Sequence, residues 1–186
     1  MPRPDYKLDR RVQCLVDVLL CFHHRRMRAI LRELARQFNQ PECIVADIGT
    51  GAKPEGSRFP NALYVSTDYV PHRGIDLVTS ATHLAIRDLT VDLVLCANVI
   101  EHLPEPDDML TEARRILRIG GYLFLVTPFM FPLHDVPYDF FRYTEYSLRR
   151  LLKDYSEISV HRILWLPLPT RLAERFVLYY VLVAKK

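Results

Sequence analysis

The chain has 186 residues, 49% of them hydrophobic, and a formal net charge of +3. A chain of this length buries roughly 70% of its unfolded surface as one compact domain, and no apolar stretch reaches the ~20 residues of a membrane span. The four cysteines show no CxxC pair or zinc-ligand spacing, which excludes a structural zinc site and predicts reduced thiols in a cytoplasmic protein.

The basic excess lies in the N-terminal segment, residues 1–40. Apolar residues recur there at steps of three and four from Leu8 to Phe38, which predicts one or two amphipathic helices. The arginines form either a solvated helix face, which we prefer, or a surface for an anionic substrate, nucleic acid or a membrane. Pro41 ends the pattern, so we expect a helical segment, residues 1–40, packed on a core, residues 41–186.

The core begins with strands. Residues 43–48 form a continuous apolar run that ends at an aspartate and a glycine turn, as expected of a buried parallel strand. Further short apolar runs bounded by turn residues predict strands at residues 62–67, 76–78, 91–97, 122–127, 158–164 and 177–184.

Two helices interrupt these strands. The apolar face of residues 106–117 predicts a helix that ends at Gly120 and Gly121 as a C-cap, and residues 143–155 predict another that opens with Thr144 as N-cap. This order indicates an α/β fold with a Rossmann-like sheet, mostly parallel with a C-terminal antiparallel strand.

Two crossovers are unusually short. Residues 50–61 contain two prolines and residues 70–75 are only six, whereas a parallel connection normally needs a dozen residues or more. We expect the helices after the first two strands to be missing, so that residues 76–78 are a vestigial edge strand or no strand. The bare sheet face would need cover from the N-terminal helices or from a partner subunit in a homodimer.

The first strand carries a candidate ligand turn. Asp47, Gly49 and Gly51 offer a carboxylate and two glycines at the carboxyl edge of the sheet, where ligands bind in open α/β folds. About twenty residues later, the second strand ends at Asp68, whose carboxylate can accept both hydroxyls of a ribose. Pro54 occupies the third glycine position of a dinucleotide fingerprint, which argues against a nicotinamide cofactor.

Several ordered motifs resemble class I S-adenosylmethionine-dependent methyltransferases. They are VADIGTG at residues 45–51, TD at 67–68, VDLVL at 91–95, NVIEHL at 98–103, and RIL at 115–117 through GG at 120–121. The segment HDVPYDFFRYT at 134–144 is similar to small bacterial members of this family. The resemblance covers roughly residues 43–152 and implies S-adenosylmethionine as cofactor.

The resemblance also implies cofactor contacts. Gly49 and Gly51 would lie against the amino acid part of S-adenosylmethionine, Asp47 would position the turn, and Asp68 would hold the ribose. At the position that often presents an acidic residue to the adenine amine, this chain has a serine followed by an alanine, and an asparagine follows the fourth strand as pocket lining. These further contacts are Ser80, Ala81 and Asn98.

A metal site is not expected from this sequence. Asn98, Glu101 and His102 share one helical face, and a few related methyltransferases bind magnesium through a Glu, Glu, His set at such spacing. Because Asn98 replaces the first carboxylate, the set is a poor one for a hard cation, and we expect a structural role.

The loop after the fifth strand, residues 128–143, would form the acceptor wall beside the methyl group. His134 is the best candidate general base because an imidazole titrates near neutrality, with Asp139 and Tyr143 as second candidates. A structural alternative is equally supported, in which Asp139 pairs with Arg142 and Thr144 caps the next helix.

The sequence thus predicts a methyltransferase for a small-molecule or sugar-like acceptor. An RNA or protein methyltransferase that uses the basic N-terminal helix is a second hypothesis, which the lack of an appended RNA-binding domain disfavours. A third is a scaffold that keeps the fold and the cofactor without catalysis.

Overall fold

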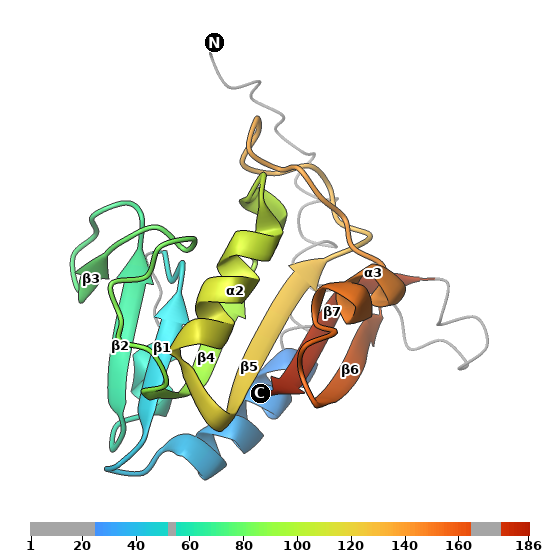
Figure 1. Ribbon diagram of the computed structural model, residues 1–186. Coiled ribbons are helices and arrows are strands. Elements are labelled where there is room, and N and C mark those ends of the chain that lie inside the picture. The colour runs from blue at the N-terminus through green and yellow to red at the C-terminus, as the bar shows by residue number, and fades with distance from the viewer. Residues whose placement is uncertain (1–24, 52–54, 165–175) are drawn as a thin grey trace.

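The computed structural model describes residues 25–51, 55–164 and 176–186 (Figure 1). A seven-stranded sheet with the order β3-β2-β1-β4-β5-β7-β6 forms its centre. Strand β7 is antiparallel to both neighbours, whereas the other strand pairs are parallel. The predicted α/β class is confirmed. The strands are β1 (Ile44–Ile48), β2 (Leu63–Asp68), β3 (Leu77–Val78), β4 (Val91–Ala97), β5 (Leu117–Pro128), β6 (Glu157–Leu164) and β7 (Val177–Lys185).

Helices cover both faces of the sheet. The helices α2 (Pro106–Ile116) and α3 (Glu145–Leu151) lie on one face, and a helix over residues 25–38 lies on the other (Figure 1). Strands β1 and β4 are therefore buried on both sides, which explains their continuous apolar sequences. In the described part of the chain, no helix is long and apolar enough to cross a membrane.

The two short crossovers lack α-helices, as predicted. Within the described residues, the connection from β1 to β2 contains only the 3₁₀ turn η1 (Glu55–Arg58), and the connection from β2 to β3 contains no helix. Strand β3 is a two-residue edge strand parallel to β2. The helix over residues 25–38 supplies cover, because Leu31, Leu34 and Phe38 pack with Phe59 against the central strands.

Two boundaries differ from prediction. The helix α2 ends at Ile116, and Gly120 and Gly121 lie inside β5 instead of capping the helix. The reason is pairing with the chain end, because the Gly120 amide donates to the Lys186 carbonyl and the Lys186 amide donates to the Gly121 carbonyl. The helix α3 is shorter than expected, but Thr144 caps it by accepting from the Ser147 amide at 3.2 Å.

We predict that the helix over residues 25–38 is essential to stability. Leu34 is 6% exposed against the sheet, so Leu34→Ala should lower the free energy of unfolding by about 2–5 kcal/mol through lost burial and a residual cavity. Glu33→Ala on the solvent side is the control and should change it by less than about 0.5 kcal/mol. Urea denaturation measures both, and equal effects would contradict the packing.

Candidate functional site

The carboxyl ends of β1, β2 and β4 meet at one edge of the sheet. Ile48, the last residue of β1, lies opposite Thr67 of β2 and opposite Cys96 of β4. The glycine turn that follows β1, the aspartate that ends β2, and Asn98 after β4 are therefore neighbours at this edge. The loop after β5 extends beyond the same ends (Figure 1).

Asp68 fastens the glycine turn to the second strand. Its carboxylate accepts from the Gly51 amide at 2.8 Å and from the Val70 amide at 2.9 Å. Each of the two carboxylate oxygens accepts one of these hydrogen bonds and keeps a further lone pair. The carboxylate is therefore oriented at the sheet edge and still able to accept hydrogen bonds from a ligand.

The two glycines of the turn serve different purposes. Both have positive φ, +65° at Gly49 and +56° at Gly51, where a side chain is strained. A Cβ at Gly49 would lie 2.5 Å from Cγ2 of Val99, whereas a Cβ at Gly51 would meet no atom of the described residues within 4 Å. Gly49 thus permits the close approach of the loop after β4, whereas Gly51 is required for its left-handed backbone alone.

Asp47 binds the segment on the other side of the turn. Its buried carboxylate accepts from the Tyr64 hydroxyl and from the Glu55 amide, the latter at 3.4 Å. Burial raises the pKa of Asp47 to about 6, and burial beside this carboxylate also raises the pKa of Tyr64. Residues 52–54, which include Pro54, lie outside the described residues.

The remaining predicted cofactor contacts lie further along the edge. Ser80 and Ala81 follow the edge strand β3, where the Ser80 hydroxyl bonds the Thr82 hydroxyl at 2.8 Å and Ala81 packs on the core. Asn98 is exposed, has a φ of +56°, and donates its amide to the Val126 carbonyl at 2.9 Å. Its side chain is therefore at the end of β4 and accessible from the edge.

Asp139 is both buried and paired. Both terminal nitrogens of Arg142 donate hydrogen bonds to the Asp139 carboxylate, one of them at 2.6 Å. This guanidinium lowers the pKa of Asp139 to about 2. The same carboxylate accepts from the His134 amide at 2.9 Å and lies 3.2 Å from the His134 Nδ1. Asp139 is thus an ionised anchor that orients His134.

Tyr143 is embedded rather than exposed to the acceptor side. It is 6% exposed, its hydroxyl lies 3.4 Å from the Ile100 carbonyl, and its ring packs beside Phe141. Burial raises the pKa of the phenol, with Glu101 adding to the effect. The phenolate is disfavoured at neutral pH, so this environment suits packing better than proton transfer.

His134 meets two residues from the segment after β4. Its Nε2 lies 4.0 Å from Oε1 of Glu101, and the His102 Nε2 lies 3.9 Å from the same oxygen. The two imidazole rings stand edge to face at 4.8 Å. Glu101 is fully buried, and burial raises its pKa to about 7. We call Glu101, His102 and His134 the Glu–His–His cluster.

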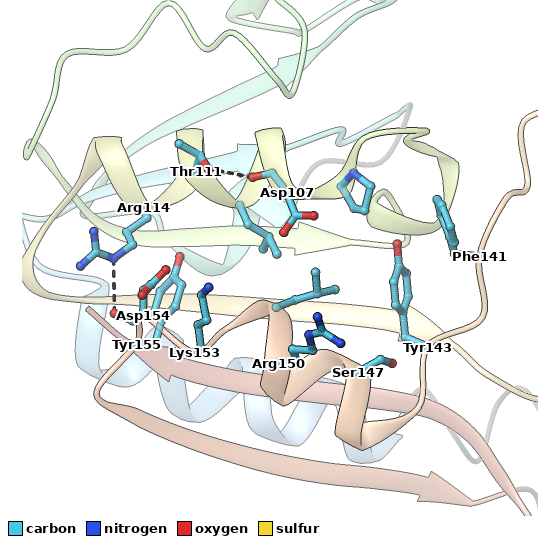
Figure 2. A pocket seen from close by; sticks show the side chains of 13 residues that line it. Asp107, Thr111, Arg114, Phe141, Tyr143, Ser147, Arg150, Lys153, Asp154 and Tyr155 are labelled. Atoms are coloured by element: carbon cyan, nitrogen blue, oxygen red, sulfur yellow. Dashed lines mark hydrogen bonds between the residues drawn. The ribbon is translucent and has the colours of Figure 1, made fainter.

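A separate cavity of about 680 Å³ lies between α2 and α3. Figure 2 shows Phe141 and Tyr143 at one end of it and Arg114 and Asp154 at the other. It follows the groove between the two helices and does not include the glycine turn, Asp68 or the Glu–His–His cluster.

Comparisons with known proteins agree with this geometry. A family model for a methyltransferase domain matches residues 57–125. This is a methyltransferase domain with the class I fold. S-adenosylmethionine, the methyl donor of this class, is its cofactor, and the edge fits such a ligand because the Asp68 carboxylate is oriented beside the backbone of Gly51 and keeps lone pairs for further hydrogen bonds. No curated protein sequence matches the chain.

Solved structures share the fold at low sequence identity. The chain is similar to the 1,6-didemethyltoxoflavin-N1-methyltransferase of Burkholderia thailandensis, with a TM-score of 0.65 and 17% identity over 100% of this chain and 93% of that one. It is also similar to a possible histamine N-methyltransferase of Thermotoga maritima, with a TM-score of 0.61 and 22% identity over 83% of this chain and 87% of that one. A third similar structure is a putative methyltransferase of Haloferax volcanii in complex with the activator Trm112, with a TM-score of 0.57 and 17% identity over 78% of this chain and 83% of that one.

Sequence reasoning missed two features of this methyltransferase. Tyr64 holds the Asp47 carboxylate, and nothing in the sequence of β2 distinguishes this tyrosine from a packing residue. The meeting of His134 with Glu101 and His102 depends on a loop 32 residues away in the sequence, because the Glu101 carbonyl accepts from the amides of Phe140 and Phe141. No local pattern reveals that contact.

We predict unequal effects of alanine at the two glycines. Gly51→Ala should cost about 1–2 kcal/mol of stability through its left-handed backbone alone, whereas Gly49→Ala should cost more because its Cβ meets Val99. Adding Val99→Ala should recover part of the Gly49→Ala loss and none of the Gly51→Ala loss, as measured by urea denaturation. Equal losses at both glycines, or no recovery, would contradict the close approach.

Proposed function

We propose that this methyltransferase holds S-adenosylmethionine at the edge formed by β1, β2 and β4, and transfers its methyl group to a small-molecule acceptor at the loop after β5. The observation that carries the proposal is the meeting of two polar sets at one sheet edge. One set is the Asp68 carboxylate with the Gly51 turn, and the other is the Glu–His–His cluster after β4.

The roles of the cofactor residues follow from their contacts. Asp68 would accept the ribose hydroxyls through the lone pairs that its two backbone bonds leave free. Gly51 would lie against the methionine part, Asp47 would hold the shape of the turn through Tyr64, and Asn98 would line the floor. Ser80 and Ala81 would approach the adenine.

Methyl transfer needs little covalent help from the protein. A lone pair of the acceptor attacks the methyl carbon, the carbon–sulfur bond breaks, and S-adenosylhomocysteine leaves. An acceptor that carries a proton must also release it. We propose that His134, anchored by Asp139, serves this activation, either by taking the proton itself or as part of the Glu–His–His cluster. Tyr143 takes a packing role.

A small acceptor is supported by two observations. The structural neighbours include proteins named as a 1,6-didemethyltoxoflavin-N1-methyltransferase and as a possible histamine N-methyltransferase. Two exposed arginines of the helix over residues 25–38 bond within the helix, because Arg32 donates to the Arg28 carbonyl and Arg36 pairs with Glu33. RNA or protein acceptors are therefore less well supported.

The proposed setting is the cytoplasm, and it rests on Cys43 and Cys96, which are free thiols buried in the core. A homodimer is not part of the proposal, because the helix over residues 25–38 gives the sheet face the cover that a partner would otherwise supply.

We predict that Asp68→Asn weakens the binding of S-adenosylhomocysteine about 10-fold to 100-fold, since hydrogen bonds to a charged group contribute about 1.5–3 kcal/mol. Isothermal titration calorimetry on the purified chain measures the affinity. Asp108→Asn, on the exposed first turn of α2, is the matched control and should leave it unchanged. Absence of binding by the unmodified chain would refute the proposed cofactor site.

We also predict that the acceptor is a small molecule. Methyl-labelled S-adenosylmethionine, incubated with the protein and a cell extract, should place label in a small molecule of the ultrafiltrate that chromatography separates from S-adenosylmethionine, and not in the RNA or protein fractions. His134→Gln should reduce this labelling at least about 100-fold with unchanged affinity for S-adenosylhomocysteine, whereas Leu133→Ala, an exposed neighbour, should not. Label in RNA or protein instead would favour the macromolecular alternative.

A further inference from the structure

Three electron-pair donors converge at the acceptor side of this methyltransferase. Glu101, His102 and His134 each offer one ligand atom, and these atoms lie within 4.8 Å of one another. Oε1 of Glu101 is buried and has no hydrogen-bond partner among the described residues. A buried carboxylate oxygen without a partner carries a large desolvation cost, so the cluster calls for an electropositive species at its centre.

The other ring nitrogens decide the protonation of the imidazoles. The His102 Nδ1 lies 2.9 Å from the Tyr138 carbonyl, and the His134 Nδ1 is hydrogen-bonded to the Pro132 carbonyl at 3.4 Å, with an Asp139 carboxylate oxygen 3.2 Å away. These partners only accept hydrogen bonds, so both Nδ1 atoms carry a proton. In the neutral form of each ring, the Nε2 atom then has a free lone pair, and each Nε2 lies within about 4 Å of the Glu101 oxygen.

This arrangement matches the surroundings of metal-bound histidines. Such histidines usually donate their second ring N–H to a backbone carbonyl or a carboxylate, which fixes the tautomer and the ring orientation. His102 has the Tyr138 carbonyl, and His134 has the Pro132 carbonyl with the Asp139 carboxylate beside it. Asp139 is itself held by Arg142, so the orienting group is rigid.

The separations suit one ion better than shared protons. The two Nε2 to Oε1 distances, 3.9 and 4.0 Å, exceed hydrogen-bond length. Two ligands each about 2.1 Å from one zinc ion are about 3.4 Å apart at a tetrahedral angle and at most about 4.2 Å apart. Small side-chain rotations therefore bring all three atoms onto one ion.

We propose that Glu101, His102 and His134 bind one divalent transition-metal ion of the Zn²⁺ class. Two imidazoles and one carboxylate favour such an ion over magnesium, which prefers oxygen ligands. The proposal departs from the sequence-based expectation of no metal, because His134 was not foreseen as a ligand. Its place at the acceptor side rests on the proposed function.

The site is of the open type. His102 and His134 keep 21% and 27% of their side-chain surface exposed, while Glu101 is enclosed. Three protein ligands with access from one side leave a coordination position for an oxygen or nitrogen of the acceptor, and coordination lowers the pKa of such a group. The ion would thus favour acceptors with an ionisable oxygen or nitrogen.

Metal titration tests the proposal independently of catalysis. The full chain, stripped with a chelator, should bind one Zn²⁺ by calorimetry, and Co²⁺ should give visible absorption bands that Zn²⁺ abolishes. His102→Ala and His134→Ala should each weaken Zn²⁺ binding at least tenfold, whereas His161→Ala, exposed on β6, should not. A variant with His23 and His24 replaced by alanine should bind normally, which excludes that pair as the ligands.

Glu101→Gln separates metal binding from structural damage. Without metal this variant should unfold at a higher temperature than the parent, because an uncompensated buried carboxylate is removed, yet it should bind Zn²⁺ at least tenfold more weakly. No Zn²⁺ binding by the parent chain, or binding unchanged in Glu101→Gln and His102→Ala, would overturn the proposal. The affinity for S-adenosylhomocysteine is measured on the same samples. It does not depend on the metal ligands, so it tests the cofactor site alone.

Discussion

The pairing of β1 with β2 on one side and β4 on the other is the constraint on which the site depends. Because all three strands are parallel, their carboxyl ends reach one edge together. Residues that follow those ends, such as Gly49, Asp68 and Asn98, become neighbours although about 50 positions of sequence separate the first from the last. The loop after β5 joins them because β5 pairs with β4 in the same direction.

The shortened crossovers change how the glycine turn is supported. In an open α/β sheet a helix usually follows this turn and presents its N-terminus to the ligand, but the described residues between β1 and β2 hold only η1. Two carboxylates fasten the turn instead, since Asp68 holds the Gly51 amide and Asp47 holds Tyr64 and the Glu55 amide. Side-chain bonds thus replace part of the support that a helix would give.

Periodicity and turn residues predicted most of the fold because each strand is a short apolar run with its own boundaries. The short crossovers were predictable as well, since chain length limits what residues 70–75 can form. The extension of β5 back to Leu117 was not, because it depends on hydrogen bonds between Gly120 and the distant Lys186. Glycines at this position resemble a helix cap until the partner strand is known.

The candidate site divides in the same way. Asp47, Gly49, Gly51 and Asp68 could be predicted from sequence because each lies at the carboxyl end of its strand or just after it, and strand direction alone places them at one edge. The environment of Glu101 could not be predicted from the sequence, which shows only its neighbour His102. His134 comes close to it through the path of the loop after β5.

The sequence also left two roles for the segment around His134 as alternatives, and the structure joins them. Arg142 fixes the Asp139 carboxylate, and the same carboxylate orients the His134 ring toward Glu101. A rigid anchor is what a ligand or acceptor-activating imidazole requires, because a ring free to rotate would seldom direct its lone pair at one point. One ion pair therefore supplies the structural lock and also the rigid support that the proposed chemical role needs.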